Sequence, residues 1–327
     1  MRCNPRSLPA LGAALVTLTL ISACGGTDSS STGTPESSGL RELRVGVTAT
    51  ANSLSVYTAE AEGIFAEHNI KVDYVTVTNG AEAIPMLVND QLDVTIGDGF
   101  GTISAATNGL PLSVFGISTI QPSDVALDPA IIFTKDKSVT VDDLAGKKFA
   151  VSALGGYHEL STKSTIDTLG GDSGKVEYVE LAPASMADAV ESGDVAGALI
   201  TEPYSTAAEQ RGLYPLAPQA VGTQGVSGTL WVATKDSAAN NADVLADFAA
   251  SVEEAGHLVN KDRDLARTVA ATYMTVEPEV IKVMRFPTFT DSLTDFSSLN
   301  TLVDLALKYK MLDKEPDIDS LTVDLTG

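Results

Sequence analysis

Residues 42–98 read ELRVGVTATANSLSVYTAEAEGIFAEHNIKVDYVTVTNGAEAIPMLVNDQLDVTIGD and decide the fold, because the chain repeats their pattern 104 positions further on. The run Lys71–Val75 then aligns with Lys175–Val179. Each copy passes through a β-rich run, an amphipathic stretch, a second β-rich run, another amphipathic stretch and a third apolar run. Chance matches are common in a chain rich in Ala and Val, but they do not preserve the order of elements. An α/β unit made twice predicts two similar lobes with a cleft between them.

The composition narrows the class of protein. A chain of 327 residues has room for two domains, and 44% apolar with 20% charged residues indicates a globular protein. The formal net charge of −22 repels nucleic acid and anionic lipid, so we expect no nucleic-acid partner. The excess of acidic residues keeps an exported protein soluble. It does not exclude an anionic ligand, because groups at a local binding site can outweigh the negative potential of the rest of the protein.

The N-terminus has the features of an export signal. Arg2 and Arg6 form a positive segment, and Leu11–Ile21 form an apolar core too short to span a membrane stably. The run Ile21-Ser22-Ala23-Cys24 resembles the lipobox of bacterial lipoproteins, whose cysteine thiol accepts diacylglycerol before cleavage. We therefore expect a signal peptide over residues 1–23 and lipidation of Cys24. The alternative is an ordinary signal peptide with an incidental cysteine.

Residues 24–39 form the predicted tether. From Gly25 to Gly39, 12 of 15 residues are Gly, Ser or Thr, which is typical of a flexible linker. A lipid at one end and a globular domain at the other would hold the protein at a membrane surface. We therefore expect the membrane as a partner through Cys24, and we place the protein on the outer face of the bacterial cytoplasmic membrane.

Cysteine and histidine offer neither a disulfide nor a metal site. Cys3 falls in the segment expected to be removed, which leaves Cys24 alone. The three histidines, His68, His158 and His257, are scattered without the spacing of metal ligands. We expect no bound metal and no cofactor.

The predicted elements divide into two lobes joined by crossings at residues 118–128 and 225–231. Strands alternate with helices, which indicates parallel sheets, and Thr229–Thr234 reads as a strand that returns to the first lobe. The helical pattern of residues 242–310 should then pack on that lobe. The expected layout is 40–119 for the first part of lobe 1, 120–231 for lobe 2, and 232–327 for the return strand and C-terminal helices of lobe 1.

Polar loops of small residues follow the predicted strands. Ligands of open α/β sheets bind at the carboxyl ends of the strands, where helix N-termini present free N–H groups. For each residue the alternative is a cap or a turn, but as a set facing one cleft they predict a binding site. The candidates are Thr48, Thr50, Asn52, Ser53, Asn79, Asp98, Gly99 and Phe100 in the first lobe, and Gly155, Gly156, Tyr157, Ser185, Thr201 and Glu202 in the second.

Catalytic signatures are absent from the sequence. It contains no Gly-x-Ser-x-Gly elbow, no Ser-x-x-Lys, no His-Glu-x-x-His and no Gly-x-x-x-x-Gly-Lys phosphate loop. Gly97–Gly101 superficially resembles a dinucleotide fingerprint, but it follows the third strand instead of the first and lacks the final glycine. We expect a protein that is not an enzyme.

Several short motifs occur in a specific order: Leu43-Arg44-Val45-Gly46-Val47, Glu62-Gly63-Ile64-Phe65, Gln91-Leu92-Asp93-Val94, Asp143-Leu144-Ala145-Gly146-Lys147-Lys148, and Glu202-Pro203. With them, residues 42–327 resemble the type 2 periplasmic solute-binding proteins of ABC importers, in the branch for sulfonates, taurine, nitrate and thiamine-type pyrimidines. One departure is Ala196, which stands near the place where the Asp of the Leu-Asp-Val motif often recurs.

The resemblance implies a periplasmic binding protein type 2 fold. In that fold two lobes, each with a mostly parallel sheet flanked by helices, are joined by two crossover segments and close around a ligand. It also implies the partners, which are a small-molecule ligand and an ABC permease with its ATPase subunits, and we expect a monomer. Two alternatives stay open: an enzyme on the same fold, similar to pyrimidine synthases, and a ligand sensor for a membrane receptor. Those synthases use a cysteine-rich segment that this chain lacks.

The candidate loops also bear on the ligand. They contain no Arg or Lys, so a plain inorganic anion would depend on helix N-termini and hydroxyls alone. Asp98 and Glu202 favour a ligand with an amine, and Tyr157, Phe100 or Trp231 could stack on a ring. We expect a small organic solute, either sulfonate- or taurine-like or an amino-heteroaromatic compound, in preference to nitrate.

Overall fold

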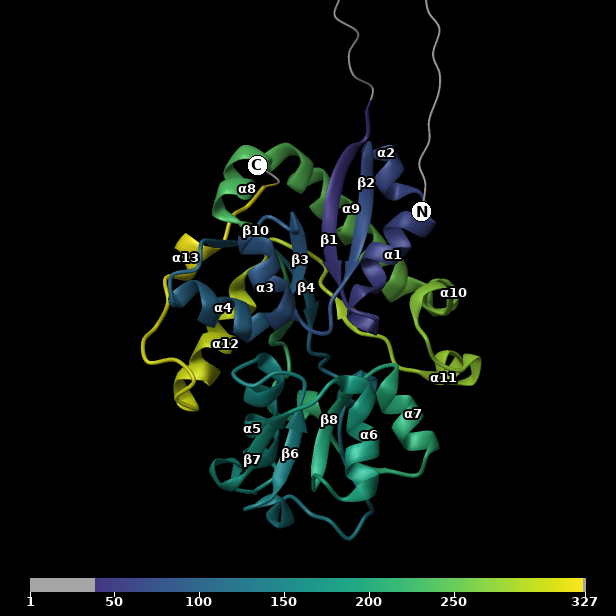
Figure 1. Ribbon diagram of the computed structural model, residues 1–327, viewed down its shortest axis with the longest axis vertical. Helices are drawn as coiled ribbons and strands as arrows, with labels where there is room; N and C mark the ends of the chain where they lie inside the picture. The colour runs from purple at the N-terminus through teal and green to yellow at the C-terminus, as the bar shows by residue number, and fades with distance from the viewer. Residues whose placement is uncertain (1–38, 326–327) are drawn as a thin grey trace, which may run out of the picture. The chain divides into compact units, whose positions relative to one another are not determined.

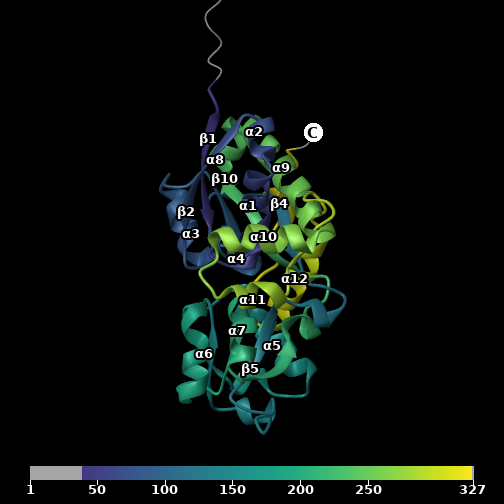
Figure 2. The same ribbon diagram turned by 90° about the vertical axis from the view of Figure 1, so that its right-hand side faces the viewer.

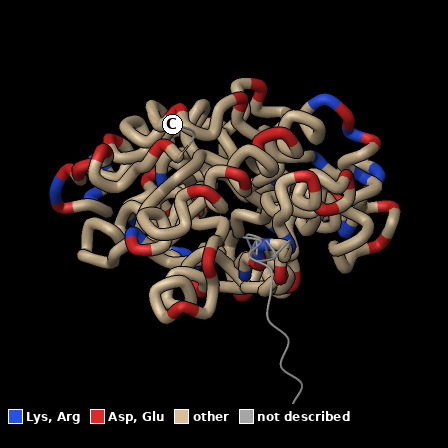
Figure 3. The backbone as a smooth tube through the Cα atoms, turned by 90° about the horizontal axis from the view of Figure 1, so that it is seen from above, with Lys and Arg blue, Asp and Glu red and all other residues tan. Residues whose placement is uncertain are grey.

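The computed structural model describes residues 39–325 (Figure 1). The predicted signal peptide, Cys24 and the tether up to Ser38 lie outside the described residues. Within the described residues, none of the helices combines the length and the apolar character that crossing a bilayer requires. Asp and Glu are spread over the chain with Lys and Arg among them, in keeping with the expected acidic surface (Figure 3).

The first sheet has six strands in the order β11-β4-β10-β3-β1-β2. Strand β1 pairs in parallel with β2 and β3. Strand β10 pairs antiparallel with β3 on one side and with β4 on the other, and so extends the sheet. Thr229–Thr234, predicted as the return strand, lies in β10. The strands are β1 (Arg41–Val47), β2 (Ile70–Thr76), β3 (Val94–Asp98), β4 (Leu112–Ile120), β10 (Ser227–Thr234) and β11 (Thr288–Phe289).

The second sheet has five strands in the order β7-β6-β8-β5-β9. Its parallel part, β7-β6-β8, repeats β2-β1-β3 of the first sheet, with the first strand of each copy in the middle. The doubled sequence therefore builds the same parallel unit twice, and antiparallel strands extend each unit into a mixed sheet. The strands are β5 (Ala130–Thr134), β6 (Lys148–Val151), β7 (Glu177–Glu180), β8 (Gly197–Thr201) and β9 (Tyr214–Pro218).

Helices flank both sheets, and we call each sheet with its helices a lobe (Figures 1 and 2). The first lobe has α1 (Leu54–Ala61), α2 (Ile64–Glu67), α3 (Gly80–Val88), α4 (Gly99–Thr107), α8 (Lys235–Asn240), α9 (Ala242–Lys261), α10 (Arg263–Tyr273), α11 (Pro278–Val283), α12 (Ser297–Lys308) and α13 (Ile318–Leu321). The second has α5 (Tyr157–Thr168), α6 (Pro183–Ser192) and α7 (Tyr204–Gln210). The C-terminal helices pack on the first lobe, and α11 and α12 also touch α7 and α5 of the second.

The two crossing segments are bonded to each other. Gln121 donates its backbone N–H to the Val226 carbonyl at 2.9 Å and accepts from Gly225 N at 3.0 Å. Asp128 is fully buried, and its carboxylate accepts at 2.5 Å from the N–H of Ala220, which precedes the second crossing. The second crossing ends before β10 begins at Ser227, so the expected boundary at residue 231 falls inside a strand of the first sheet. The reason is that the whole of β10 pairs with β4.

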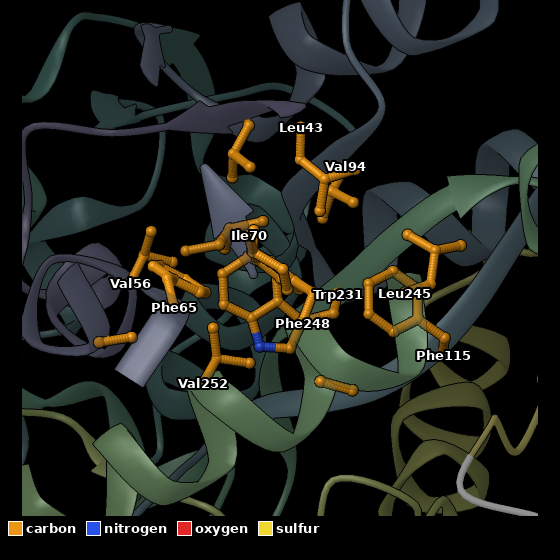
Figure 4. Close-up of a cluster of buried hydrophobic side chains, with 14 of the residues drawn as sticks. Leu43, Val56, Phe65, Ile70, Val94, Phe115, Trp231, Leu245, Phe248 and Val252 are labelled. Atoms are coloured by element: carbon orange, nitrogen blue, oxygen red, sulfur yellow. The ribbon is translucent and has the colours of Figure 1, made fainter. Parts of the chain in front are cut away.

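The core of the first lobe is aromatic and lies between β10 and α9 (Figure 4). Phe248 of α9 packs face to face on Phe65 at 5.5 Å between ring centroids, and it makes edge contacts with Trp231 at 5.1 Å and Phe115 at 6.3 Å. Trp231 is 1% exposed and belongs to this core, so it cannot serve as a platform for a ligand ring.

Phe248→Ala should lower the free energy of unfolding by about 3–5 kcal/mol, because it empties the centre of this cluster and leaves three aromatic rings unsupported. Urea unfolding followed by tryptophan fluorescence measures the loss. The control is Val283→Ala in α11, where the side chain is 64% exposed and little change is expected. Equal effects of the two substitutions would contradict this account of the core.

Candidate functional site

A cavity of about 90 Å³ lies where the carboxyl ends of the two parallel units face each other. It is lined from the first lobe by Thr48 after β1, Asn79 after β2 and Asp98 at the end of β3. Ser152 after β6, Pro183 after β7 and Glu202 after β8 line it from the second. All six strand ends of the doubled unit thus contribute, as expected for an open α/β sheet.

Helix beginnings are the main backbone feature of this cavity. Its lining includes Ala51 at the start of a 3-10 turn, Gly80 at the start of α3 and Tyr157 at the start of α5. The first N–H groups of a helix have no partner within the helix and carry partial positive charge. Asn79 caps α3 by accepting from Glu82 N at 3.0 Å and reaches across the cleft to donate to the Ser152 carbonyl at 3.1 Å.

The structure brings eight of the predicted residues to the cavity: Thr48, Thr50, Asn52, Asn79, Asp98, Tyr157, Thr201 and Glu202. The other six do not line it. Ser53 is buried, and its hydroxyl accepts from Thr48 N at 3.0 Å instead of capping α1. Phe100 is 1% exposed within a hydrophobic cluster, and Gly99 packs against the start of β10. Gly155 and Ser185 are exposed to solvent. Gly156 is buried next to the Asp98 carboxylate.

Sequence reasoning missed much of the lining. Ser152 aligns with Thr48 when the sequence is shifted by 104 residues. The repeat could therefore have predicted Ser152 as a lining residue. Thr119, Gln121 and Thr229 come from the ends of the crossings, which necessarily border a cleft between two lobes. The further lining residues are Thr78, Gly80, Ala81, Ile96, Gly97, Pro129, Ala130, Ala153, His158, Pro183, Gln219 and Gly228.

Asp98 joins the two lobes. Its side chain accepts from Gly101 N at 2.5 Å and thereby caps α4, and both its oxygens lie 2.9 Å from Tyr157 N at the start of α5 in the other lobe. Burial raises the pKa of Asp98 to about 6, against the opposing effect of these backbone hydrogen bonds. Asp98 is therefore ionised at neutral pH, without a cationic partner among the described residues.

Glu202 also joins the lobes, by an ion pair. Its side chain is 0% exposed and accepts from Thr206 N at 3.1 Å and from the Thr206 hydroxyl at 2.7 Å. Arg285, between α11 and β11, donates to it from the backbone N at 3.1 Å and from Nη1 at 3.3 Å. Arg285 also pairs with Glu209 at 2.6 Å, so Glu202 belongs to a network of charges between the lobes. Because Glu202 already has a cation beside it, the argument from sequence that it favours an amine on the ligand is corrected.

His158 and Ser152 form a partly buried pair at the second-lobe wall. The Ser152 hydroxyl lies 2.5 Å from Nδ1 of His158. Burial lowers the pKa of His158 to about 4, so the imidazole is neutral at physiological pH. The cavity wall therefore holds no cationic side chain at neutral pH.

The end of the cavity nearest the crossings is polar and incompletely bonded. Thr119 and Thr229 share a hydrogen bond of 2.7 Å between their hydroxyls. The Tyr157 hydroxyl and Gln121 Oε1 are buried without a partner of good geometry, although Thr223 lies near the tyrosine. A Cβ on Gly228 would lie 3.2 Å from both Gln121 Nε2 and Thr119 Oγ1, so glycine leaves room for these groups.

A metal centre is not indicated. Within residues 39–325, His, Cys, Asp and Glu form no group of three or more that could hold a metal ion.

Comparison with known proteins identifies the family. Residues 50–264 match the model of the family described as NMT1/THI5 like. The chain belongs to this family. The taurine-binding periplasmic protein of Escherichia coli (strain K12) is 30% identical to it over 201 residues, which is 60% of this chain and 60% of that protein. The predicted resemblance to periplasmic solute-binding proteins is thereby confirmed.

Solved structures share the fold of this NMT1/THI5-like chain. The aliphatic sulphonate binding protein SsuA of E. coli superposes with a TM-score of 0.69 at 21% identity, over 86% of this chain and 97% of that one. The nitrate-binding protein NrtA of Synechocystis PCC 6803 gives 0.74 at 14% identity, over 86% of each chain. The periplasmic-binding-protein fold is confirmed. All three relatives are named as binding proteins, which supports the expectation that the chain is not an enzyme.

Arg285→Met should destabilise the ligand-free protein by about 3 kcal/mol, because it leaves the buried Glu202 carboxylate without its cation. Chemical denaturation measures this loss. The matched control is Arg211→Met, which breaks an exposed ion pair with Asp188 and Glu191 and should cost less than about 1 kcal/mol. Adding Glu202→Gln to Arg285→Met should restore much of the stability. An Arg285 variant no weaker than the Arg211 variant would show that the buried pair is not needed.

His158→Gln should make the protein less sensitive to acid. The pKa of His158 is lowered from 6.5 to about 4 in the folded protein, so its contribution to stability is complete above pH 6.5 and is lost as the pH falls towards 4. Between pH 7.5 and 4.5 the variant should lose about 2 kcal/mol less of its free energy of unfolding than the native protein. Denaturant titrations at the two pH values test this, with exposed His257→Gln as the control. Parallel curves for all three proteins would refute the assignment.

Proposed function

We propose that this protein is the solute-binding component of an ABC importer and that it captures a small organic solute with one anionic group, such as a sulfonate or taurine. The observation that carries this proposal is the convergence of helix beginnings with hydroxyl and amide side chains on one small cavity between two lobes. The names of the taurine- and sulphonate-binding relatives support it.

Helix beginnings supply the attraction for the anionic group. Backbone N–H groups at the starts of helices bind sulfate- and phosphate-like oxygens without a cationic side chain. Hydroxyl groups of Thr48, Thr50 and Thr201 add donors around the same space. A volume of about 90 Å³ favours a solute of few heavy atoms.

An amino-heteroaromatic ligand is less well supported. Phe100 and Trp231 are each 1% exposed in hydrophobic clusters, which leaves Tyr157 as the aromatic residue that lines the cavity. A ring would thus have one edge of one aromatic side chain to contact, and not a stacking platform. The sulfonate-like alternative is the one that the lining favours.

Transport also requires delivery to a membrane. We propose that a lipid on Cys24 and the tether of residues 24–39 hold the binding domain near its permease and ATPase subunits, on the outer face of the cytoplasmic membrane. The support is the run Ile21-Ser22-Ala23-Cys24 and the Gly/Ser/Thr-rich segment that follows it. We further propose that the protein works as a monomer whose closed form the permease recognises; a sensor would present the same closed form to a receptor.

Asn52→Ala should weaken binding of ethanesulfonate or taurine about five- to tenfold, because it removes an amide that lines the cavity and makes no hydrogen bond with other described residues. Isothermal titration calorimetry of the native and variant proteins measures the change, and thermal unfolding should show an unaltered ligand-free protein. Ser185→Ala, which is exposed and outside the cavity, is the control. The proposal fails if the native protein binds neither solute, or if it chemically converts one of them.

A further inference from the structure

The start of α5 faces the cavity, but a carboxylate of the protein already occupies it. α5 has no side-chain cap of its own, because its N-cap is Gly156. Its first N–H, that of Tyr157, instead points at Asp98 of the opposite lobe, with 2.9 Å to each carboxylate oxygen. The arrangement is that of a helix N-terminus holding an anion, with a side chain in the place of the ligand.

We propose that Asp98 is a specificity-determining residue whose carboxylate occupies the start of α5 in place of a ligand anion, so that the cavity accepts solutes with one anionic group and rejects those with two. The occupation of α5 follows from the geometry of Asp98 and Tyr157 alone. The selectivity rests in addition on the proposed function of this cavity.

The charges around the cavity support this selectivity. The Glu202 carboxylate lies 3.3 Å from Arg285, which also pairs with Glu209, and His158 is neutral at physiological pH because burial lowers its pKa. Asp98 is then the charged side chain among the described lining residues that has no cationic partner, and it is negative.

Among the described residues, the helix start that remains for a solute is that of α3 at Gly80, because the Ala51 N–H already donates to the Glu202 carbonyl at 3.4 Å. One anionic group can bind there. A second anionic group on the solute would meet the Asp98 carboxylate, which holds the N–H at the start of α5. Two like charges in a site from which water is largely excluded repel each other strongly.

The remaining polar atoms at that end fit an uncharged or cationic group. The Tyr157 hydroxyl and Gln121 Oε1 are both buried without a partner of good geometry. Hydroxyl and amide oxygens accept hydrogen bonds, as does a carboxylate such as Asp98. A hydroxyl or ammonium group on the solute would donate to Gln121 Oε1 and Asp98, which have no hydrogen to give to a second sulfonate; the Tyr157 hydroxyl can donate to either kind of group.

The binding test compares ethanesulfonate with ethane-1,2-disulfonate, which share a two-carbon chain and differ in charge, on the full-length protein. The native protein should bind the monosulfonate at least about tenfold more tightly than the disulfonate. Asp98→Ser keeps a residue able to cap α4 but removes the carboxylate, so this preference should fall roughly tenfold or more. Asp98→Asn should reduce it similarly, since it removes the charge and nearly preserves the shape.

The control is Asp262→Ser, which alters an exposed aspartate that caps α10 and does not line the cavity. It should leave the preference at its native value. A native protein that binds the disulfonate as tightly as the monosulfonate, or variants at Asp98 with an unchanged ratio, would overturn the selectivity.

A second measurement needs no ligand. Asp98 is the hydrogen-bond acceptor of Tyr157 N in the structure, so amide exchange at Tyr157 in the ligand-free protein should be at least about tenfold faster in Asp98→Ser than in the native protein or in Asp262→Ser. An unchanged rate would overturn the occupation of α5. If the native protein binds neither sulfonate, the proposed function fails, while this exchange rate still decides whether Asp98 holds the start of α5.

Discussion

Two carboxylates at the ends of equivalent strands join the lobes across the cleft, Glu202 fully buried and Asp98 partly buried. They lie 104 positions apart; Asp98 ends β3 and Glu202 directly follows β8, the third strands of the two parallel units. Each side chain accepts a hydrogen bond from the helix that follows its own strand, and each also accepts one from the opposite lobe. Contact between the lobes therefore includes hydrogen bonds from N–H donors to these two acidic side chains.

The two acids differ in how their charge is compensated. Glu202 has Arg285 beside it, and the pair forms a fixed connection at the edge of the cavity. Asp98 has backbone N–H groups and, among the described residues, no cation beside it. The two copies thus differ: one acid is held in an ion pair, and the other is the residue for which we propose a role in ligand selection.

The two crossings are bonded to each other. Gln121 of the first crossing exchanges backbone hydrogen bonds with Gly225 and Val226 at the second, and the Asp128 carboxylate accepts from Ala220 N, which precedes the second crossing. The side chain of Gln121 also lines the cavity. If the protein works as we propose, a solute bonded to this side chain contacts a segment that joins the lobes, which links ligand binding to the equilibrium between open and closed forms.

The sequence by itself determined the architecture and the general position of the site. The run from Lys71 to Asp98 and its copy from Lys175 to Glu202 carry strand and helix periodicities in the same order, and parallel strands place their carboxyl ends on one edge. Hydrophobic periodicity depends on local spacing, which a sequence displays directly. Even Ser152, which was missed, could have been read from its alignment with Thr48.

Only the tertiary structure decided what each polar residue does. Ser53 and Thr48 both follow β1, yet one hydroxyl is buried against its neighbour's N–H while the other faces the cavity. Glu202 looked like a partner for an amine until Arg285, 83 residues later, proved to lie against it. Such pairings join segments far apart in the chain, so their existence depends on how the lobes pack and not on any local pattern. The contact between Asp98 and Tyr157 could not be predicted from the sequence for the same reason. It forms only where the end of β3 in one lobe meets the start of α5 in the other.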